Sequence, residues 1–181
     1  MKVLVTGVSG QLGFDVMREL LARGIEAKGA SRSDFSLTDF AAMRRFVEAH
    51  RPTAIIHCAA YTAVDKAEDE PELCREVNAA ATGELARLAK EIGAKLLYIS
   101  TDYVFPGTGE DFYEPADEKA PCNVYGESKL LGEEAAREAL EELFIVRISW
   151  VFGENGKNFI KTMLRLAETH EELSVVGDQI G

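Results

Sequence analysis

The stretch Thr6-Gly7-Val8-Ser9-Gly10-Gln11-Leu12-Gly13 spaces three glycines three residues apart. Residues 1–6 before it are a short β-branched, apolar run, which predicts a buried parallel strand, and residues 11–23 after it have helical apolar spacing. A glycine-rich turn between strand and helix directs backbone N–H groups and the positive end of the helix dipole at a pyrophosphate. The stretch therefore predicts a dinucleotide site that uses Gly7, Gly10 and Gly13. The alternative is a tight turn without a ligand.

Strand-like runs and helical segments alternate along the rest of the chain. This alternation predicts an α/β fold with a doubly wound parallel sheet, a Rossmann-like NAD(P)-binding fold. The apolar stripes of the middle helices are expected to face the core and not a ligand, and the last helix is expected to turn Phe159, Met163 and Leu166 inward. Helices are expected around 40–47, over 73–88, from 123 through 136 and over 158–169, and further strands at 25–30, 53–58, 95–100, 143–148 and 173–176.

The composition restricts the partners and the location of the protein. The 181 residues carry a formal net charge of -11 without a basic run, so no nucleic-acid partner is expected. No apolar run approaches the roughly 20 residues that span a bilayer, and no signal-type segment precedes the first strand, so we expect a cytoplasmic protein without a membrane partner. Three cysteines without Cys-x-x-Cys spacing predict reduced thiols and neither a disulfide framework nor a metal site. They are Cys58, Cys74 and Cys122.

Tyr125 and Lys129 are four residues apart in a predicted helix, so they share one helix face. A free tyrosine has a pKa near ~10 and is a poor acid–base catalyst at neutral pH. A neighbouring ammonium group stabilises the phenolate and lowers that pKa, so the pair predicts a proton-transfer site. Lys129 is also placed to hold the ribose of a cofactor. The alternative is an exposed tyrosine beside a solvated lysine.

Ser100-Thr101-Asp102 ends a predicted strand, at the sheet edge where open α/β sheets bind ligands. Thr101 is expected to donate its hydroxyl to a substrate oxygen beside Tyr125. Together with the glycine turn, this set predicts hydride transfer from a nicotinamide cofactor. Residues 105–122, rich in proline, glycine and acidic side chains, are expected to form a long irregular loop, a type that is usually functional or mobile.

The end of the second predicted strand bears on the choice of cofactor. An acidic residue there usually accepts from the ribose 2′-hydroxyl of NAD, whereas an arginine accommodates the 2′-phosphate of NADP. The chain has Ser31 and Arg32 at this point and no carboxylate until Asp34. We therefore predict NADPH in preference to NADH, with Ser31 and Arg32 near the phosphate. Asp34 and Phe35 are alternatively expected to flank the adenine, and a solvated Arg32 is the alternative without a ligand.

Six stretches resemble the dTDP-4-dehydrorhamnose reductase family of extended short-chain dehydrogenases/reductases. The Gly-x-x-Gly-x-x-Gly spacing of residues 7–13 is itself similar to this superfamily. The stretches occur in the family's order, and the resemblance covers essentially the whole chain. They are AAYTAVDKAE (59–68), STDYVFPG (100–107), NVYGESK (123–129), RISWVFG (147–153), NFIKTM (158–163) and VVGDQIG (175–181).

The resemblance implies NADPH-dependent reduction of the C4 ketone of dTDP-4-dehydro-L-rhamnose to dTDP-L-rhamnose, a step in dTDP-rhamnose and polysaccharide biosynthesis. It also implies that Tyr125 protonates the developing alkoxide, that Thr101 orients and polarises the carbonyl, and that Lys129 grips the ribose. The residues implied to contact the sugar nucleotide are Thr101, Asp102, Tyr103 and Trp150. Those implied to line the dinucleotide are Gly10, Gln11, Leu12, Asp34, Phe35, Ala59, Ala60 and Tyr61.

The chain departs from the family in two respects. Members commonly continue after the Asp-Gln-x-Gly segment, so residues 1–181 are expected to be the dinucleotide-binding Rossmann-like domain, with most of the C-terminal substrate domain absent. Some members form a magnesium-linked dimer through a glutamate where this chain has Asp15, so a homodimer stays open and no metal site is predicted. Two alternatives stay open: another reductase, epimerase or dehydratase acting on a sugar nucleotide, and a non-catalytic NADP(H)-binding regulatory module.

Overall fold

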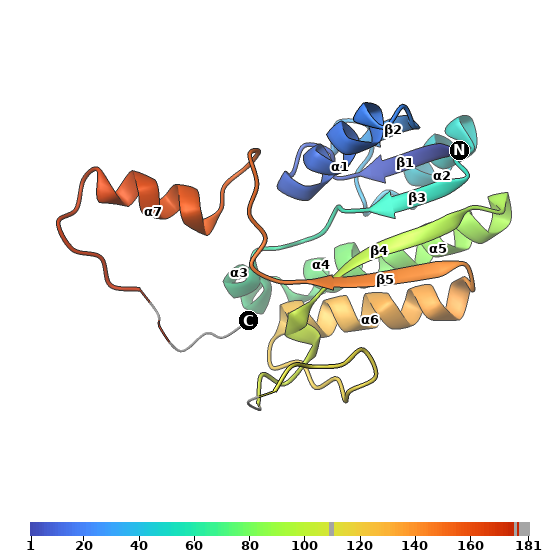
Figure 1. Cartoon of the computed structure of the whole chain (residues 1–181). Helices are drawn as coiled ribbons and strands as arrows, with labels where there is room; N and C mark the ends of the chain where they lie inside the picture. Colours follow the sequence, from blue (N-terminus) through green and yellow to red (C-terminus); the bar gives the residue numbers. More distant parts are fainter. Residues whose placement is uncertain (109–110, 176, 178–181) are drawn as a thin grey trace.

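Five parallel strands form the centre of the molecule in a computed structural model, which describes residues 1–108, 111–175 and 177. Their order in the sheet is β2-β1-β3-β4-β5 (Figure 1). The strands predicted from the sequence as far as residue 148 are confirmed to within one residue at each end. Their bounds are Lys2–Thr6 for β1, Glu26–Ala30 for β2, Ala54–His57 for β3, Lys95–Thr101 for β4 and Leu143–Ile148 for β5.

Helices cover both faces of the sheet, which confirms the predicted doubly wound α/β architecture (Figure 1). Helix α1 (Gln11–Ala22) lies on one face, and α2 (Phe40–His50), α5 (Ala81–Ile92) and α6 (Val124–Ala139) lie on the other. Strand β1, which lies between β2 and β3, is therefore buried on both sides, and Val3, Leu4 and Val5 are all nearly inaccessible to solvent.

The hydrophobic core lies between the sheet and the layer of α2, α5 and α6. Leu4, Ile55 and Leu96 project into it from three neighbouring strands. Alternate residues of a strand point to opposite faces, so these side chains form one apolar surface for the helices. The helical side of the core is formed by Met43 and Val47 of α2, Ala81, Leu85, Leu88 and Ala89 of α5, and Ala136 of α6, among others.

The long helix predicted over 73–88 is present, but it consists of three consecutive segments. These are α4 (Pro71–Arg75), a π-helical turn (Glu76–Ala80) and α5. A short helix that the sequence reading did not predict, α3 (Val64–Asp69), precedes them. The expectation that the whole apolar stripe faces the core is wrong at its N-terminal end, because Leu73 and Val77 line a cleft. The π-helical turn changes the rotation of the helix at this point, so its two ends face different surroundings.

The predictions for the last part of the chain are partly wrong. Leu173, Ser174 and Val175 are not in a strand, and Val176 lies outside the described residues, as do residues 178–181. Helix α7 (Phe159–Ala167) forms where predicted, but Phe159 is 53% exposed and no residue of the helix is fully buried. Figure 1 shows α7 standing away from the sheet, and residues 168–175 do not add a strand to the edge of β5. A strand needs a neighbour for its backbone hydrogen bonds, and residues 173–175 have none in the described structure.

Candidate functional site

A cleft of about 1100 Å³ lies along the carboxyl ends of the parallel strands. Segments that follow all five strands contribute to it, together with the first turns of α6. It brings together every residue predicted to contact cofactor or substrate except Gly13 and Asp34. The predicted residues that line it are Gly7, Gly10, Gln11, Leu12, Ser31, Arg32, Phe35, Ala59, Ala60, Tyr61, Thr101, Asp102, Tyr103, Tyr125, Lys129 and Trp150.

The glycine turn is closely packed. The N–H groups of Gly7 and Val8 donate to the carbonyl oxygen of Ala30, and that of Gly10 donates to the carbonyl oxygen of Gly7. Gly7 has φ +72°, which favours glycine, and a Cβ there would lie 2.8 Å from the backbone of Ala59. Gly13 is not among the residues that line the cleft, and its predicted contact with the cofactor stays a prediction. It lies inside α1, where a Cβ would be 2.3 Å from the carbonyl oxygen of Gly7, so it lets the helix approach the turn. No side chain in the described structure caps α1 at Gly10, so the first N–H groups of the helix suit a pyrophosphate.

A buried pair, Thr6 and His57, lies next to the glycine turn. The hydroxyl of Thr6 lies 2.7 Å from Nδ1 of His57 and accepts a hydrogen bond from the backbone N–H of Ala59. Burial lowers the pKa of His57 to about 3, with a further contribution from the charge of Lys129. The imidazole is therefore neutral at physiological pH, and the pair ties the ends of β1 and β3 together without adding a charge.

The turn after β2 places Arg32 at the cleft and Asp34 away from it. The Asp34 carboxylate accepts hydrogen bonds from the backbone N–H of Ser31 at 2.8 Å and from its hydroxyl at 2.9 Å. These bonds hold the pKa of Asp34 below its ordinary value. The prediction that Asp34 contacts the cofactor is therefore not supported by its position, because its oxygens close the turn. Arg32 is exposed and borders the cleft, as predicted for a group that meets a phosphate.

Tyr125 and Lys129 both reach the cleft from one face of α6, as their spacing predicts. The Asn123 side chain begins this helix by accepting a hydrogen bond from the backbone N–H of Gly126 at 2.7 Å. Lys129 is only 2% exposed, and its ammonium group donates to the carbonyl oxygen of Ile99 at 2.7 Å and lies 4.1 Å from the centre of the Tyr98 ring. Carbonyl and ring together provide the partners that a buried ammonium needs.

The pKa of Tyr125 differs from the sequence prediction. Burial raises the pKa of its phenol to about 12, although the Thr101 hydroxyl acts to lower it. The predicted lowering by Lys129 is wrong for this structure, because the ammonium is directed at Ile99 and Tyr98. Burial also lowers the pKa of Lys129 to about 7, although the Glu133 carboxylate acts in the opposite direction. Tyr125 is therefore a protonated phenol at neutral pH, suited to giving a proton to a developing oxyanion.

Residues 101–103 line the cleft together with Tyr125. The Thr101 hydroxyl donates to the Asp102 carboxylate at 2.9 Å and accepts from the backbone N–H of Tyr103 at 3.2 Å. Tyr103 belongs to the short 3₁₀ turn Asp102–Val104, and its ring meets Tyr125 edge-on with 5.6 Å between ring centres. The threonine hydroxyl and both phenol side chains thus gather where the sequence places substrate contacts.

Asn78 organises the site, and the sequence reading did not identify it. It lies in the π-helical turn, and its side chain accepts from the N–H of Tyr61 at 2.8 Å and donates to the carbonyl of Tyr61 at 3.0 Å. The amide also donates to the Ser128 hydroxyl at 2.9 Å, next to Lys129. One buried side chain therefore holds the Tyr61 segment against α6. Its signal in the sequence is a lone asparagine inside an apolar stripe.

The segment after β5 connects the glycine turn to Trp150. Trp150 has φ +52°, an uncommon value for a residue with a side chain, and its indole is 54% exposed at the cleft. Further along, the Asn155 amide donates to the carbonyl oxygens of Ser9 and Gly10 at 3.3 and 3.1 Å. The Asn158 amide donates to the side-chain oxygen of Gln11 at 3.0 Å. These bonds hold the segment after β5 against the glycine turn and the start of α1.

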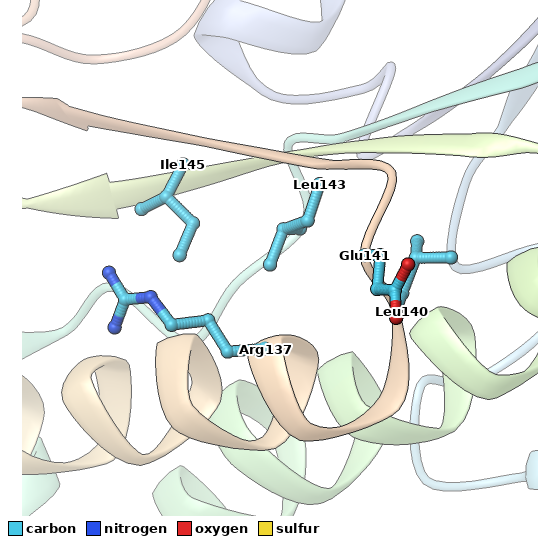
Figure 2. A pocket seen from close by; sticks show the side chains of 5 residues that line it. All are labelled: Arg137, Leu140, Glu141, Leu143 and Ile145. Carbon is cyan, nitrogen blue, oxygen red and sulfur yellow. The ribbon is translucent and has the colours of Figure 1, made fainter.

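A second hollow, of about 460 Å³, lies between the end of α6 and β5 and contains none of the predicted site residues (Figure 2). Its floor is apolar, with Leu143 and Ile145 pointing toward α6, and Arg137 and Glu141 lie at its rim. Among the described residues, no group of three or more histidine, cysteine, aspartate or glutamate side chains is arranged to hold a metal ion. The described residues also contain no helix that is long and apolar enough to cross a membrane.

Known proteins resemble this chain along its whole length. The family model for the RmlD substrate binding domain matches residues 1–181. The dTDP-4-dehydrorhamnose reductase of Escherichia coli (strain K12) is 44% identical over 185 residues, which cover 100% of this chain and 62% of that enzyme. The chain therefore spans less than two thirds of the length of this relative.

Solved structures agree with the sequence comparison. The dTDP-4-dehydrorhamnose reductase of Clostridium acetobutylicum superposes with a TM-score of 0.95 at 40% identity, covering 99% of this chain and 64% of that one. The enzyme of Bacillus anthracis, solved in complex with NADP, also gives 0.95, at 43% identity over 98% of this chain and 63% of that one. With the family model matched from end to end and the fold in agreement, the chain belongs to the RmlD substrate binding domain family.

Proposed function

We propose that this chain carries the cofactor site and the proton-transfer residues of an NADPH-dependent dTDP-4-dehydrorhamnose reductase. The observation that carries the proposal is that Thr101, Tyr125 and Lys129 line the same cleft as the glycine turn. A phenol that can give a proton next to a dinucleotide site suits reduction of a carbonyl to an alcohol. The relatives named dTDP-4-dehydrorhamnose reductase support the C4 ketone of dTDP-4-dehydro-L-rhamnose as the substrate.

The cleft fits a dinucleotide in shape and in chemistry. The uncapped N-terminus of α1 and the Gly7 turn would hold the pyrophosphate, Arg32 and Ser31 the 2′-phosphate, and Lys129 the nicotinamide ribose. NADPH, when bound, supplies the hydride. The rest of the chemistry belongs to side chains of this chain.

Three side chains have separate parts in the reaction. Tyr125 gives its phenolic proton to the carbonyl oxygen as negative charge develops there, and its raised pKa keeps that proton available at neutral pH. Thr101 donates a hydrogen bond to the same oxygen in place of its present bond to Asp102. Lys129, buried beside them, holds the ribose hydroxyls and fixes the distance between cofactor and phenol. Asp102, Tyr103 and Trp150 contact the sugar nucleotide.

A titration with NADPH, followed by addition of dTDP-4-dehydro-L-rhamnose, tests the proposal through the nicotinamide absorbance. NADPH should be oxidised, and Tyr125→Phe should reduce turnover by roughly 10²- to 10⁴-fold while leaving the NADPH dissociation constant nearly unchanged. Tyr113→Phe is the matched control, because Tyr113 lies outside the lining of the cleft. Tight NADPH binding without oxidation would contradict the catalytic reading and favour a regulatory module. Cofactor that co-purifies with the chain would favour an epimerase.

The preference for NADPH rests on Arg32. Arg32→Glu should weaken NADPH binding by roughly tenfold or more, because it replaces a charge-assisted contact with repulsion of the 2′-phosphate. NADH lacks this phosphate, so its dissociation constant should change little. If the dissociation constants of NADPH and NADH rose equally, Arg32 would support the turn and would not select the cofactor.

The proposal extends to the setting in which the chain works. Residues 1–181 serve as a dinucleotide-binding domain, and a cytoplasmic location follows from a reaction that consumes NADPH and a nucleotide-activated sugar. A homodimer is also proposed, on the resemblance to family members that dimerise near the position of Asp15. Sedimentation of the chain with and without NADPH would test it, and a purely monomeric species at micromolar concentration would contradict it.

A further inference from the structure

Glu133 is a fully buried carboxylate that the proposed mechanism does not use. It lies on α6, four residues after Lys129 and on the same helix face, and its partners come from β4, from β5 and from α6 itself. One of its oxygens accepts from the Ser100 hydroxyl at 2.6 Å and from Nε of Arg147 at 2.8 Å. The other accepts from Nη2 of Arg147 at 2.6 Å and from Arg137 at 3.1 Å. Arg147 thus meets the carboxylate with two parallel hydrogen bonds, the strongest geometry for such a pair.

The carboxylate is charged despite its burial. Burial alone raises the pKa of Glu133, but hydrogen bonds from Arg147 and Ser100 outweigh that effect and hold the pKa below its ordinary value. Removing one partner of a buried, hydrogen-bonded ion pair leaves the other without compensation, so such pairs are sensitive to substitution. A charged pair of this kind beside a proposed active site calls for a functional explanation.

The contacts of Arg147 continue beyond Glu133. Its Nη1 donates to the carbonyl oxygen of Pro115 at 3.2 Å, and its guanidinium lies 5.0 Å from the centre of the Phe105 ring. Phe105 in turn stacks on Tyr113, with nearly parallel rings 4.5 Å apart. The arginine therefore holds the start and the middle of the loop that follows the proposed substrate-contacting residues.

Seen along the chain, the Glu133–Arg147 pair holds both ends of one short segment. Ser100, bonded to Glu133, directly precedes Thr101, and Phe105, packed on Arg147, directly follows Val104. Between them lie Thr101, Asp102 and Tyr103, the residues proposed to meet the carbonyl and the sugar. Helix α6, the catalytic helix, carries both Tyr125 and Glu133. Two tethers, the Ser100–Glu133 hydrogen bond and the packing of Phe105 on Arg147, therefore fix the segment relative to Tyr125.

We propose that Glu133 and Arg147 are positioning residues that hold the segment 101–104 against the catalytic helix, so that Thr101 and Tyr125 address the same substrate oxygen. This inference rests on the proposed function for its kinetic consequence, but its structural part can be measured without turnover. The pair contributes no residue to the glycine turn or to the turn with Arg32, and Lys129 is the dinucleotide contact on which the charge of Glu133 acts.

The structural test is amide hydrogen exchange on Glu133→Gln, which keeps the shape of the side chain and removes its charge. The amides of Tyr103 and Phe105 should exchange roughly tenfold faster or more, because the segment opens locally, while those of Leu4 and Val5 in β1 should not change. Arg137→Gln is the matched control. It removes the partner of Glu133 that is 49% exposed and leaves both tethers in place, so exchange should match the wild type.

The kinetic test separates positioning from cofactor binding. Glu133→Gln should lower kcat by roughly 10- to 100-fold, the effect of a displacement near 1 Å at reacting groups. Ser100→Ala leaves the charge beside Lys129 in place, so it should lower kcat while the NADPH dissociation constant stays within about twofold. Arg147→Lys keeps the charge but not the two-pronged contact, so it should give an intermediate loss. Should the wild-type chain not oxidise NADPH at all, the proposed function fails, and the exchange result still decides the structural part.

Two further variants keep the inference testable if Glu133→Gln does not fold. Ser100→Ala and Phe105→Leu each remove one tether and leave the ion pair intact, so each should loosen its own end of the segment. Unchanged exchange at Tyr103 and Phe105 in these variants would overturn the inference. An Arg137→Gln variant that behaves like Glu133→Gln would also overturn it, since the pair would then support the fold in general.

Discussion

Lys129→Met should remove most of the pH dependence of folding stability between pH 7 and pH 9. Burial lowers the pKa of Lys129 to about 7 in the folded chain, from an ordinary value of 10.5. Between these two values the unfolded chain holds a proton that the folded chain has released. Stability therefore rises with pH in this range, and the gain is lost as the pH falls through 7.

The magnitude follows from the width of the range. One pH unit with a difference of one proton corresponds to about 1.36 kcal/mol, and the difference grows from about half a proton at pH 7 to nearly one at pH 9, giving about 2 kcal/mol in total. Above pH 9 the Cys58 thiol acts in the opposite direction, since burial raises its pKa from 9.0 to about 12. The rise attributable to Lys129 is therefore confined to a readily measured interval.

Urea unfolding followed by circular dichroism at pH 7, 8 and 9, without nucleotide, measures this effect. The wild type should gain about 2 kcal/mol across the series, whereas Lys129→Met should be more stable at pH 7 and nearly flat. Lys95→Met is the control, because the side chain of Lys95 is 60% exposed and its substitution should leave the slope intact. A flat wild-type profile, or a Lys129→Met variant with the wild-type slope, would refute the reasoning.

Two further substitutions test the packing around the cleft. Gly13→Ala would place a Cβ 2.3 Å from the carbonyl oxygen of Gly7, so the turn must retreat by about 1 Å, and the NADPH dissociation constant should rise roughly tenfold or more. Fluorescence titration measures this, with Gly83→Ala in α5 as a control that should bind normally. Asn78→Ala leaves both backbone groups of Tyr61 without their side-chain partner and should lower the free energy of unfolding by about 2–3 kcal/mol in urea. A loss below half a kcal/mol would mean that water replaces the amide.

The sequence is most informative where a local rule acts alone. The glycine turn, the five strands to residue 148 and the start of α6 at Asn123 follow from apolar spacing and capping, so they are predictable. Such spacing identifies the apolar face of α7 but not what covers it, and for this reason Phe159 is exposed and residues 173–175 are not a strand. An apolar stripe predicts burial only where a second element lies opposite it.

The site residues show the same division. Positions along strands and helices brought Thr101, Tyr125 and Lys129 together as predicted, because the edge of a parallel sheet gathers them. The prediction that Lys129 lowers the pKa of Tyr125 was wrong. A pKa depends on burial and on the direction of hydrogen bonds, and the spacing of residues in the sequence specifies neither. The contact of Asp34 with the cofactor stays a prediction. Its carboxylate, three residues after Ser31, folds back on the backbone, a turn that the sequence can signal. Glu133 gives no local signal, since its partners lie far apart in the chain.

The N-terminal strand β1 lies between β2 and β3, so both of its neighbours are made after it. Once His57 has left the ribosome, the three strands that carry the glycine turn, Arg32 and Ala59 can pair. The segment with Thr101, the helix with Tyr125 and the edge strand β5 are synthesised later. Folding from the N-terminus would thus assemble the nucleotide half of the cleft before the half that performs chemistry. A dinucleotide that binds these three strands would stabilise them by mass action. The later segments, which carry Thr101 and Tyr125, would then fold against a nucleotide site that is already formed.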